Sequence, residues 1–493
     1  MLSTIAVLSV PANADSEPPN VLFIAVDDMN DWVSCLGGYP GAVETPHIDR
    51  LAASGTLFTN AHCPSPLCAP SRAAVLTGMF PSTSGIYGNQ HWWFPNLPEV
   101  VSLPQRFRDA GYTALGAGKI FHHTAGNHPP KPWDRFQRLT FANDPWFRGA
   151  TINYPWSNPA PFPEEFPFSE VSGLGHENDW GDTGIPEPAY EDEQSAEFAI
   201  KVLESPAESP FFLACGFFRP HLPWYVPQRF FDLYPLDHIQ LPQAPKHDLD
   251  DLPDAGLKLA AARRGDFDRI RESGRWRHAV QAYLAAISYA DHQVGRVLAA
   301  LNQGPHAENT IVVFWSDHGW HLGEKRHWHK GTLWEETTRV PLIIRAPGLP
   351  PGRCDRPVSL IDLYPTLMDV TGLNGPDHLD GQSLRPLLEN PQRPWNRPAR
   401  VEFGRGNAAV RSQRYRLIQY QDGSQELYDH GVDPHEWTNR SDDPSLAATL
   451  RSLVSQLPTR WAPPRASKAA FDFDPTSFTW THKETGTITR GVE

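Results

Sequence analysis

The chain has 493 residues, and its 43 Lys and Arg side chains against 57 Asp and Glu give a formal net charge of −14. So acidic a chain is a poor candidate for a nucleic-acid-binding protein. Charged residues at 20% and hydrophobic residues at 40% are typical of a folded protein and exclude a disordered one. Five cysteines, without a C-x-x-C pair, offer neither a disulfide framework nor a zinc site, although Cys63 and Cys68 are near enough in sequence for one bridge.

The first residues predict an export signal. Residues 2–10 are an apolar run too short to cross a bilayer, and Ala12-Asn13-Ala14 is an A-x-A cleavage pattern, although a positively charged start is missing. We expect residues 1–18 to be a signal peptide and leader. The mature protein is then expected to be secreted or periplasmic, with no membrane span.

Two nearly continuous apolar runs, residues 20–26 and 310–315, end in Asp27-Asp28 and in Ser316-Asp317-His318-Gly319. Such runs are typical of central parallel strands, and polar residues at their carboxyl ends mark the usual ligand crevice of an α/β sheet. Further strands are predicted at 209–215 and 340–344. Apolar residues at three- and four-residue steps predict helices over residues 48–54, 69–77, 103–110, 195–203, 279–301 and 361–370, the last ending at Gly372.

This alternation predicts a layered α/β domain over residues 19–395. Within it, residues 127–188 lack periodicity and are rich in Pro, Trp and Phe, which favours a long ordered excursion over one edge. Residues 396–493 read as a smaller α+β subdomain: an antiparallel sheet of strands at 401–403, 408–410, 415–420 and 425–428, a helix at 446–457 and an irregular tail.

The most informative segment is C-A-P-S-R-A-A-V-L-T-G at residues 68–78. Pro70 suits the first turn of a helix and Gly78 its end, so Cys68 falls at the N-terminus, where the helix dipole favours anions and lowers a thiol's pKa. Arg72 is one turn further on the same side. A nucleophile, a helix end and an arginine suit a tetrahedral oxyanion such as sulfate or phosphate. The alternative is an incidental buried cysteine.

The string C-x-P-S-R followed by L-T-G resembles the motif of the type I sulfatases, whose cysteine is oxidised to formylglycine. Further motifs follow in that family's order up to about residue 445: N-V-L-F with D-D at 20–28, T-P-H-I-D-R-L-A at 45–52, G-K-I-F-H at 118–122, R-P-H-L-P at 219–223, D-H-G at 317–319, E-L-Y-D at 426–429 and D-P-H-E at 433–436. G-K-I-F-H and G-E-K-R-H-W-H-K at 323–330 are most similar to the iduronate 2-sulfatase branch. The resemblance implies an alkaline-phosphatase-like fold: a large mixed sheet flanked by helices, with the smaller antiparallel sheet at the C-terminus.

Asp27, Asp28 and Asp317 would form an oxygen-rich pocket suited to Ca²⁺ or Mg²⁺. The alternative for adjacent acids is a solvated loop. The resemblance adds Cys68 and His318 to the metal ligands and implies Ca²⁺. An imidazole is a less natural ligand for a hard cation, and from the residues alone Mg²⁺ and Mn²⁺ stay open.

The resemblance also implies a mechanism. Residue 68, as a hydrated formylglycine made by a formylglycine-generating enzyme, would attack sulfur. Arg72 and Lys119 would hold the hydrate, and Lys119, His221 and Lys330 would grip the sulfate oxygens. His221 and Lys330 are the candidates to protonate the leaving oxygen, and His122 would then remove a proton so that sulfate departs. In the competing interpretation Lys119 is a surface charge and the histidines are structural, or His123 replaces His122.

Substrate contacts are predicted more weakly. Residues 91–94 (H-W-W-F), Trp224-Tyr225, Trp320 and Trp328 are candidates for stacking on sugar rings, although aromatic clusters are more often core. Residues 325–327 (K-R-H) could form a basic island for a polyanion, or a solvated turn.

The sequence therefore predicts a sulfuric ester hydrolase acting on a sulfated carbohydrate, either a uronate 2-sulfate or a sulfated polysaccharide. Two alternatives stay open. One is a phosphate or phosphonate monoester hydrolase on the same scaffold, and the other is an inactive glycan-binding homologue.

Overall fold

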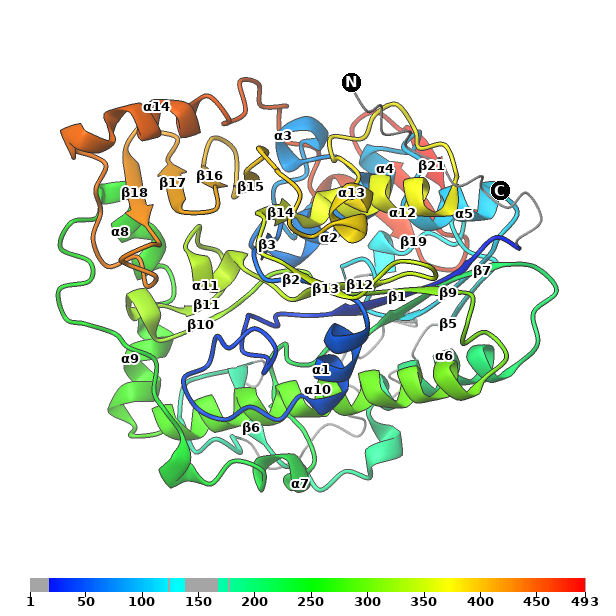
Figure 1. Ribbon diagram of the computed structural model, residues 1–493, viewed down its shortest axis with the longest axis horizontal. Helices are drawn as coiled ribbons and strands as arrows, with labels where there is room; N and C mark the ends of the chain where they lie inside the picture. The colour runs from blue at the N-terminus through cyan, green and yellow to red at the C-terminus, as the bar shows by residue number, and fades with distance from the viewer. Residues whose placement is uncertain (1–16, 123–124, 138–166, 176–177, 493) are drawn as a thin grey trace, which may run out of the picture.

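The computed structural model describes residues 17–122, 125–137, 167–175 and 178–492, and an eight-stranded sheet runs through its middle (Figure 1). The strand order is β13-β2-β12-β9-β1-β7-β4-β5. In that order the strands are Gly352–Cys354, Thr56–Phe58, Leu342–Arg345, Thr310–Ser316, Asn20–Val26, Phe211–Gly216, Thr113–Gly118 and Arg135–Gln137.

Strand β1 lies near the centre of the sheet, parallel to β7 on one side and to β9 on the other. Strand β12 runs antiparallel to both β2 and β9, so the sheet is mixed, as predicted. Side chains alternate across β1: Leu22, Ile24 and Val26 belong to one hydrophobic core, and the residues between them to the other. The continuous apolar run at residues 20–26 is explained by burial on both faces.

One layer of helices covers each face of the sheet (Figure 1). The lower layer in this view consists of α1 (Pro46–Ser54), α6 (Glu191–Glu204) and α10 (Trp276–Gln303). The upper layer includes α2 (Cys68–Thr77), α5 (Leu103–Asp109) and α12 (Leu363–Thr371). The six helices predicted between residues 48 and 370 are confirmed to within a few residues, and Gly372 ends α12 in the left-handed conformation with φ 72°.

Shorter elements connect these layers. The short helices are α3 (Pro81–Ser84), α4 (Trp93–Asn96), α7 (Gln228–Phe231), α8 (Asp254–Ala261), α9 (Arg264–Glu272), α11 (Glu335–Thr338) and α13 (Arg385–Glu389). The short strand pairs are β3 (Ala61–His62) with β14 (Val358–Ser359), β6 (Trp180–Gly181) with β8 (Trp224–Tyr225), and β10 (His321–Leu322) with β11 (Trp328–His329). Of the predicted excursion at 127–188, residues 138–166 lie outside the described residues, and the described parts supply β5 and β6.

The C-terminal sheet is confirmed, but the prediction of an irregular tail is wrong. Four antiparallel strands form the sheet: β15 (Ala399–Glu402), β16 (Ala408–Arg411), β17 (Tyr415–Gln419) and β18 (Gln425–Asp429), followed by α14 (Ala447–Val454). The tail then forms a three-stranded sheet of β19 (Phe471–Asp474), β20 (Thr479–His482) and β21 (Ile488–Arg490). The tail is ordered because its aromatic side chains reach a core: Trp480 is fully buried, with its ring centre 5.3 Å from that of Phe94.

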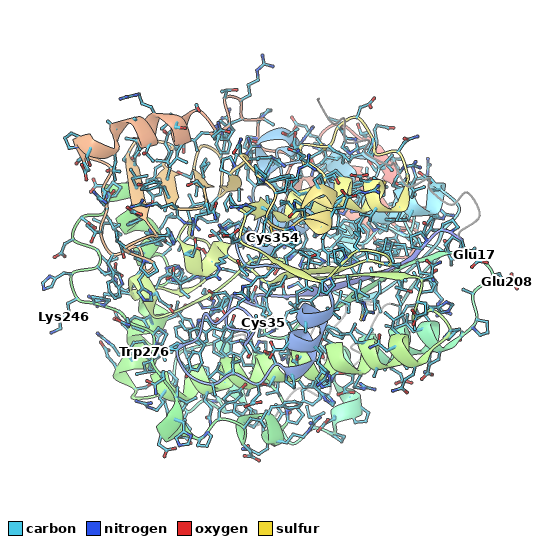
Figure 2. All side chains as sticks on the ribbon, viewed as in Figure 1. Glu17, Cys35, Glu208, Lys246, Trp276 and Cys354 are labelled. Carbon is cyan, nitrogen blue, oxygen red and sulfur yellow. The ribbon has the colours of Figure 1, made fainter. Side chains whose placement is uncertain are left out.

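Side chains fill the space on both sides of the sheet (Figure 2). All five cysteines are free thiols, so the bridge between Cys63 and Cys68 that the sequence left open is not formed. Cys35 packs against the lower core, and Cys354 belongs to the upper one. Within the described ranges, no helix has the length and apolar character needed to cross a bilayer. The predicted cleavage pattern lies outside the described residues.

Candidate active site

Three carboxylates and an imidazole gather at the carboxyl ends of β1 and β9. Because Val26 pairs with Ser316 in the parallel register, the next residues, Asp27 and Asp317, end neighbouring strands. The side chains of Asp27, Asp28, Asp317 and His318 are completely buried. The Asp28 N–H donates to the Asp317 carboxylate at 3.1 Å, which ties the two strand ends together. The edge that the sequence marked as a ligand crevice therefore carries the predicted acids.

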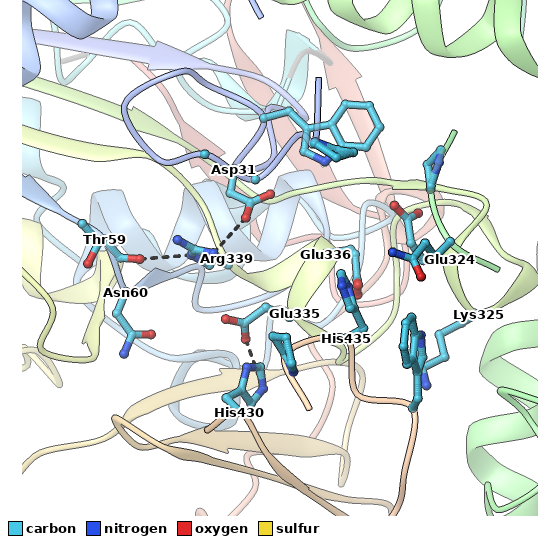
Figure 3. Close-up of a pocket in the computed structure, with 18 of the residues that line it drawn as sticks. Asp31, Thr59, Asn60, Glu324, Lys325, Glu335, Glu336, Arg339, His430 and His435 are labelled. Atoms are coloured by element: carbon cyan, nitrogen blue, oxygen red, sulfur yellow. Dashed lines mark hydrogen bonds and ion pairs between the residues drawn. The ribbon is translucent and has the colours of Figure 1, made fainter. Parts of the chain in front are cut away.

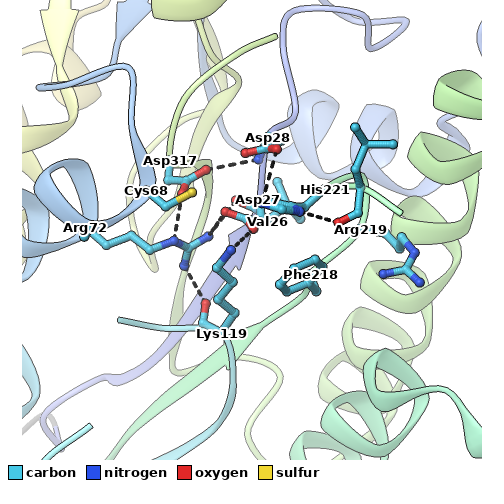
Figure 4. A network of polar contacts seen from close by, with 12 residues as sticks. Val26, Asp27, Asp28, Cys68, Arg72, Lys119, Phe218, Arg219, His221 and Asp317 are labelled. Carbon is cyan, nitrogen blue, oxygen red and sulfur yellow. Dashed lines mark hydrogen bonds and ion pairs between the residues drawn. The ribbon is translucent and has the colours of Figure 1, made fainter. Parts of the chain in front are cut away.

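Cys68 is the first residue of α2, and its thiol points at this cluster (Figure 4). Its sulfur lies 3.3 Å from His318 Nε2 and 3.0 Å from Lys330 Nζ. The N-cap residue of α2 makes no side-chain cap, but the Asn89 side chain accepts a hydrogen bond from the Ala69 N–H at 2.9 Å. The Ser71 hydroxyl donates to the Asp317 carbonyl at 2.6 Å and fastens the helix to the end of β9. The contacts of Ala69 with Asn89 and of Ser71 with Asp317 thus fix the first turn of α2, which carries residue 68.

Arg72 is buried beneath the cluster, and its guanidinium uses all five N–H donors within the protein. Nε donates to Asp317 at 2.8 Å, and Nη2 donates to Asp27 at 3.0 Å. The remaining donors reach the carbonyl oxygens of Val26, Lys119 and Ile120. No donor is left for a hydrate or a substrate. In this structure Arg72 positions two of the acids. Its role in holding a hydrate at residue 68 stays a prediction.

Two lysines bring positive charge to the same point. Lys119 Nζ contacts the Asp27 carboxylate and lies 4.2 Å from the centre of the Phe218 ring. Lys330 Nζ donates to the two Asp28 oxygens at 2.7 and 3.0 Å, besides its contact with Cys68. Lys119 is fully buried, so the alternative of a surface charge is wrong for this residue.

The predicted histidines complete the ring around Cys68. His122 and His221 both lie beside Cys68, whose side chain favours the charged form of each imidazole. His221 Nε2 also lies 3.7 Å from the Asp28 carboxylate, and its side chain keeps 18% of its surface exposed. His123, the alternative to His122, lies outside the described residues. The described site residues that the sequence predicted are all brought together.

The protonation equilibria reflect this crowding. Burial disfavours the Cys68 thiolate, but Lys119 and Lys330 outweigh burial and hold the pKa of the thiol well below its ordinary value. Burial raises the pKa of Asp28 to about 8, and burial likewise raises the pKa of Asp317 to about 6. Burial disfavours the charged form of His318, but Asp317 and Asp28 outweigh burial and raise its pKa to about 9.

The donor set fits a divalent cation. One oxygen each from Asp27 and Asp317, the Cys68 sulfur and a His318 nitrogen all lie within 4.8 Å of one another, and Asp27, Asp28, Cys68 and His221 form a second such group. Carboxylate oxygens are the ligands preferred by hard cations. A cation would also stabilise the ionised forms of Asp28 and Asp317, whose pKa values are raised by burial.

A cavity of about 850 Å³ is lined by none of the residues of this cluster; Figure 3 shows its lining. It is lined by acids, among them Asp31, Glu324, Glu335 and Glu336. Asp31 is paired with Arg339 at 2.9 Å, and Glu335 is paired with Arg411 at 3.2 Å. The lining thus combines paired acids with the cations Lys325, Arg339 and Arg411, and the cavity is not part of the cluster around Cys68.

The aromatic residues proposed to stack on sugars are mostly core, so that prediction is wrong. Trp93, Trp224, Tyr225, Trp320 and Trp328 are at most 1% exposed, and Trp224 packs 5.3 Å from Tyr283. His91 and Phe94 are buried too, while Trp92 is half-buried and packs against Phe473 at 5.5 Å. An alternating or clustered aromatic pattern does not tell a core face from a binding face.

The basic island at residues 325–327 is also wrong. Lys325 is buried, with its Nζ 2.6 Å from Asp248, and His327 is buried against the carbonyls of Ala260 and Lys330. Arg326 pairs with Asp268 at 3.3 Å. Because these side chains are buried or paired, they do not form the predicted positive surface.

Several residues of the site were not found from the sequence. Tyr283 of α10 donates to the Asp28 carbonyl, Asn89 caps α2, and Asp192 accepts the N–H groups of Phe218 and Arg219 beside His221. Each lies far along the chain from the residue it holds, and none stands in a motif. Only the fold shows these contacts.

Comparison with known proteins decides the family. A family model described as sulfatase matches residues 19–373, and one described as N-sulphoglucosamine sulphohydrolase, C-terminal, matches residues 323–461. The chain belongs to the sulfatase family. It is therefore a sulfuric ester hydrolase, and this family generally uses a metal and a formylglycine. The cluster around Cys68 contains residues that could hold such a metal.

Individual relatives span most of the chain. A sulfatase of Formosa agariphila is 39% identical over 90% of this chain and 87% of its own length, and human iduronate 2-sulfatase is 33% identical over 74% and 71%. Among solved structures, a 2-O GAG sulfatase superimposes with a TM-score of 0.68 at 25% identity, covering 89% and 91%. The phosphonate monoester hydrolase of Agrobacterium radiobacter, at 23% identity and a TM-score of 0.72 over 92% and 98%, shares the alkaline-phosphatase-like fold.

Proposed function

We propose that this sulfatase removes sulfate from a sulfated carbohydrate, with Cys68 converted to formylglycine by a formylglycine-generating enzyme and with Ca²⁺ as the metal. The observation that carries the proposal is the setting of Cys68, at the start of a helix, 3.0 Å from Lys330 and 3.3 Å from His318, above three buried carboxylates. A uronate 2-sulfate is one substrate candidate, because relatives are named iduronate 2-sulfatase and 2-O GAG sulfatase. A sulfated polysaccharide is the other, since a relative 27% identical is named an ulvan-active sulfatase.

Asp27, Asp28, Asp317 and His318 would hold the cation, and residue 68 would lie beside it. When bound, the metal supplies positive charge that polarises sulfate oxygens, and formylglycine supplies a hydrated aldehyde as nucleophile. The protein's own part is to fix their positions. Arg72 serves this purpose by orienting Asp27 and Asp317 with charged hydrogen bonds.

Lys119, His221 and Lys330 would bind the sulfate oxygens through their N–H groups. Of the two candidate acids, Lys330 holds the proton in the free protein: burial opposes its charge, but Asp28 and Cys68 raise its pKa. Burial, and then Lys330 and Lys119, lower the pKa of His221 to about 3, so its imidazole is neutral. We therefore assign protonation of the leaving oxygen to Lys330, hydrogen bonding to His221, and removal of a proton at residue 68 to His122.

Three further parts of the proposal concern the whole chain. Residues 1–18 are proposed as a signal peptide and leader, which supports a secreted or periplasmic location. Residues 19–395 are proposed as the catalytic domain and 396–493 as the C-terminal subdomain, with the boundary between α13 and β15. The separation of the four-stranded sheet β15–β18 from the eight-stranded sheet supports a division in this region.

The proposal is tested by sulfate release from a panel of defined sulfated saccharides, using enzyme from a host that forms formylglycine and mass analysis of the peptide containing residue 68. We expect an aldehyde there, release of sulfate, and loss of this activity in Cys68→Ala. Cys63→Ala is the matched control: this thiol is also buried, but it only faces the Thr337 carbonyl at 3.6 Å, so activity should persist.

Two results would contradict the proposal. A large preference for nitrophenyl phosphate over nitrophenyl sulfate would favour the phosphate or phosphonate monoester hydrolase. A residue 68 that stays a thiol, together with undetectable sulfate release, would favour the inactive glycan-binding homologue.

A further inference from the structure

In the loop that follows β1, residues 28–30 have buried backbone polar groups that require hydrogen-bond partners. Asp28 adopts φ 63°, in the left-handed region that residues other than glycine rarely occupy. Its carboxylate lies inside the cluster, whereas its carbonyl oxygen points to the opposite side, toward α10. Because Asp28 and Asn30 are at most 1% exposed, water cannot satisfy the polar groups of this turn. The protein must supply their partners.

Two hydroxyl groups supply these partners. The Tyr283 hydroxyl donates to the Asp28 carbonyl at 2.7 Å and accepts from the Asn30 N–H at 3.0 Å. The Ser316 hydroxyl accepts from the Met29 N–H at 3.0 Å and donates to the His318 carbonyl at 3.1 Å. We call Tyr283 and Ser316 the hydroxyl clasp. It binds three consecutive residues, starting with Asp28, to α10 below the sheet and to the end of β9.

The helix gives Tyr283 a fixed position. It is completely buried in α10, an element of 28 residues, and its ring packs 5.3 Å from that of Trp224 and 5.7 Å from that of Trp32. A hydroxyl held so rigidly fixes the peptide that it contacts, and with it the direction of the Asp28 side chain. Within the part of the chain that the structure describes, neither hydroxyl hydrogen-bonds to Lys119, His221 or Lys330.

We propose that the Tyr283 and Ser316 hydroxyls are positioning groups that hold the Asp28 carboxylate in the conformation that binds a divalent cation. This inference rests on the proposed function for the metal, but it concerns residues outside the ligand set. Removing a hydroxyl should let the strained turn relax and carry the carboxylate away from its neighbours, which weakens binding of the cation before it affects any other step.

The test is a calorimetric titration of CaCl₂ into the metal-stripped full-length chain. We expect Tyr283→Phe to raise the dissociation constant roughly 10- to 100-fold, the range typical of partners behind metal ligands, and Ser316→Ala to raise it in the same direction. Tyr289→Phe is the matched control on the same helix: within the described residues its buried hydroxyl has no hydrogen-bond partner, so Ca²⁺ affinity should not change. Excess CaCl₂ should restore sulfate release in Tyr283→Phe, which a general loss of structure would not allow.

Unchanged affinity in folded Tyr283→Phe overturns the inference. If that variant does not fold, unchanged affinity in Ser316→Ala overturns it instead. A wild-type chain that binds no Ca²⁺, Mg²⁺ or Mn²⁺ overturns both the inference and the metal assignment. Weaker binding in Tyr283→Phe and not in Tyr289→Phe supports it even if sulfate release is never observed, so the two proposals fail separately.

Discussion

Lys330 is proposed to have two roles, binding sulfate and protonating the leaving oxygen. An experiment can separate them. Lys330 touches Asp28 and Cys68, and we assign it the proton that the leaving oxygen receives. Nitrophenolate is a good leaving group and departs without a proton. A sugar alkoxide is a poor leaving group and must be protonated as it departs. We expect Lys330→Ala to lower kcat/KM roughly 10²- to 10⁴-fold on a sulfated saccharide, with a much smaller loss on nitrophenyl sulfate.

The control for this variant is Lys258→Ala, which removes an exposed lysine from α8 and should leave both rates unchanged. Equal losses on the two substrates would mean that Lys330 binds sulfate without delivering a proton. A loss below tenfold on both would remove it from the mechanism.

At the scale of residues, the sequence predicted which side chains meet but not what surrounds them. Asp27, Cys68 and Lys330 were found because each stands in a motif whose chemistry is recognisable. The same approach failed for Trp224, Trp328 and Lys325, which are buried. Residue type determines chemistry, but exposure depends on packing between distant segments, and that information is not local.

Helix α1 is held at its N-terminus by a carboxylate from α10. Asp291 accepts the N–H groups of His47 at 3.0 Å and Ile48 at 2.7 Å, which caps a helix whose own N-cap residue makes no side-chain bond. Burial nevertheless dominates and raises the pKa of Asp291 from 3.8 to about 7, with a further contribution from Asp49.

This pKa shift has a definite consequence for stability. Between about pH 4 and pH 7 the folded protein keeps a proton that the unfolded chain releases, so the stability contributed by Asp291 is complete at low pH and declines as pH rises to 7. In Asp291→Asn the side chain stays neutral. We expect the free energy of unfolding of the wild type, relative to this variant, to fall by on the order of 4 kcal/mol from pH 4 to pH 7.

Denaturant unfolding at a series of pH values measures this difference. Asp237→Asn provides the reference, because the Asp237 side chain is 83% exposed and its substitution should give a flat difference. A difference for Asp291→Asn that grows with pH would contradict the expected sign.

Among the elements, the long apolar strands were predicted well and the small-residue strand was not. β1 and β9 are rich in Val, Ile and Phe, whereas β4 reads T-A-L-G-A-G and has little strand propensity. Its small residues are required by close packing: a Cβ at Gly118 would meet the Gly216 carbonyl at 1.9 Å. Tertiary contact therefore overrides local preference in β4.

On the scale of the whole molecule, the C-terminal part is joined to the site by buried charges. Arg416 of β17 is completely buried and pairs with Glu335 and Glu436, and Glu335 follows Lys330 by five residues. The Glu436 carboxylate in turn accepts the Glu335 N–H at 2.9 Å. The sheet of β15–β18 thus supports the segment that carries Lys330, although it contributes none of the predicted catalytic side chains.

The last strands, β19–β21, lie on the other side of the molecule from the sheet of β15–β18 (Figure 1). Trp480 of β20 stacks on Phe473 at 4.9 Å and packs against Phe94, while the neighbouring Trp93 stacks on Phe121 at 4.8 Å, next to His122. The sequence suggested no order here because these strands are only three or four residues long. The strands depend on packing against a core that includes Phe94, nearly 400 residues earlier in the chain.

Trp480→Ala tests whether the packing of β19–β21 against Phe94 stabilises the fold. Removing a fully buried indole should lower the free energy of unfolding by about 3–5 kcal/mol, since the cavity left between Phe94 and Phe473 cannot collapse completely. Chemical denaturation measures the loss of stability. In limited proteolysis, the first cuts in the variant should fall in the tail beyond residue 466. Trp461→Ala, which removes a half-buried indole from the same part of the chain, should cost less. A stability for Trp480→Ala within about 1 kcal/mol of the wild type, with the tail still protected, would mean that β19–β21 rest on the surface without stabilising it.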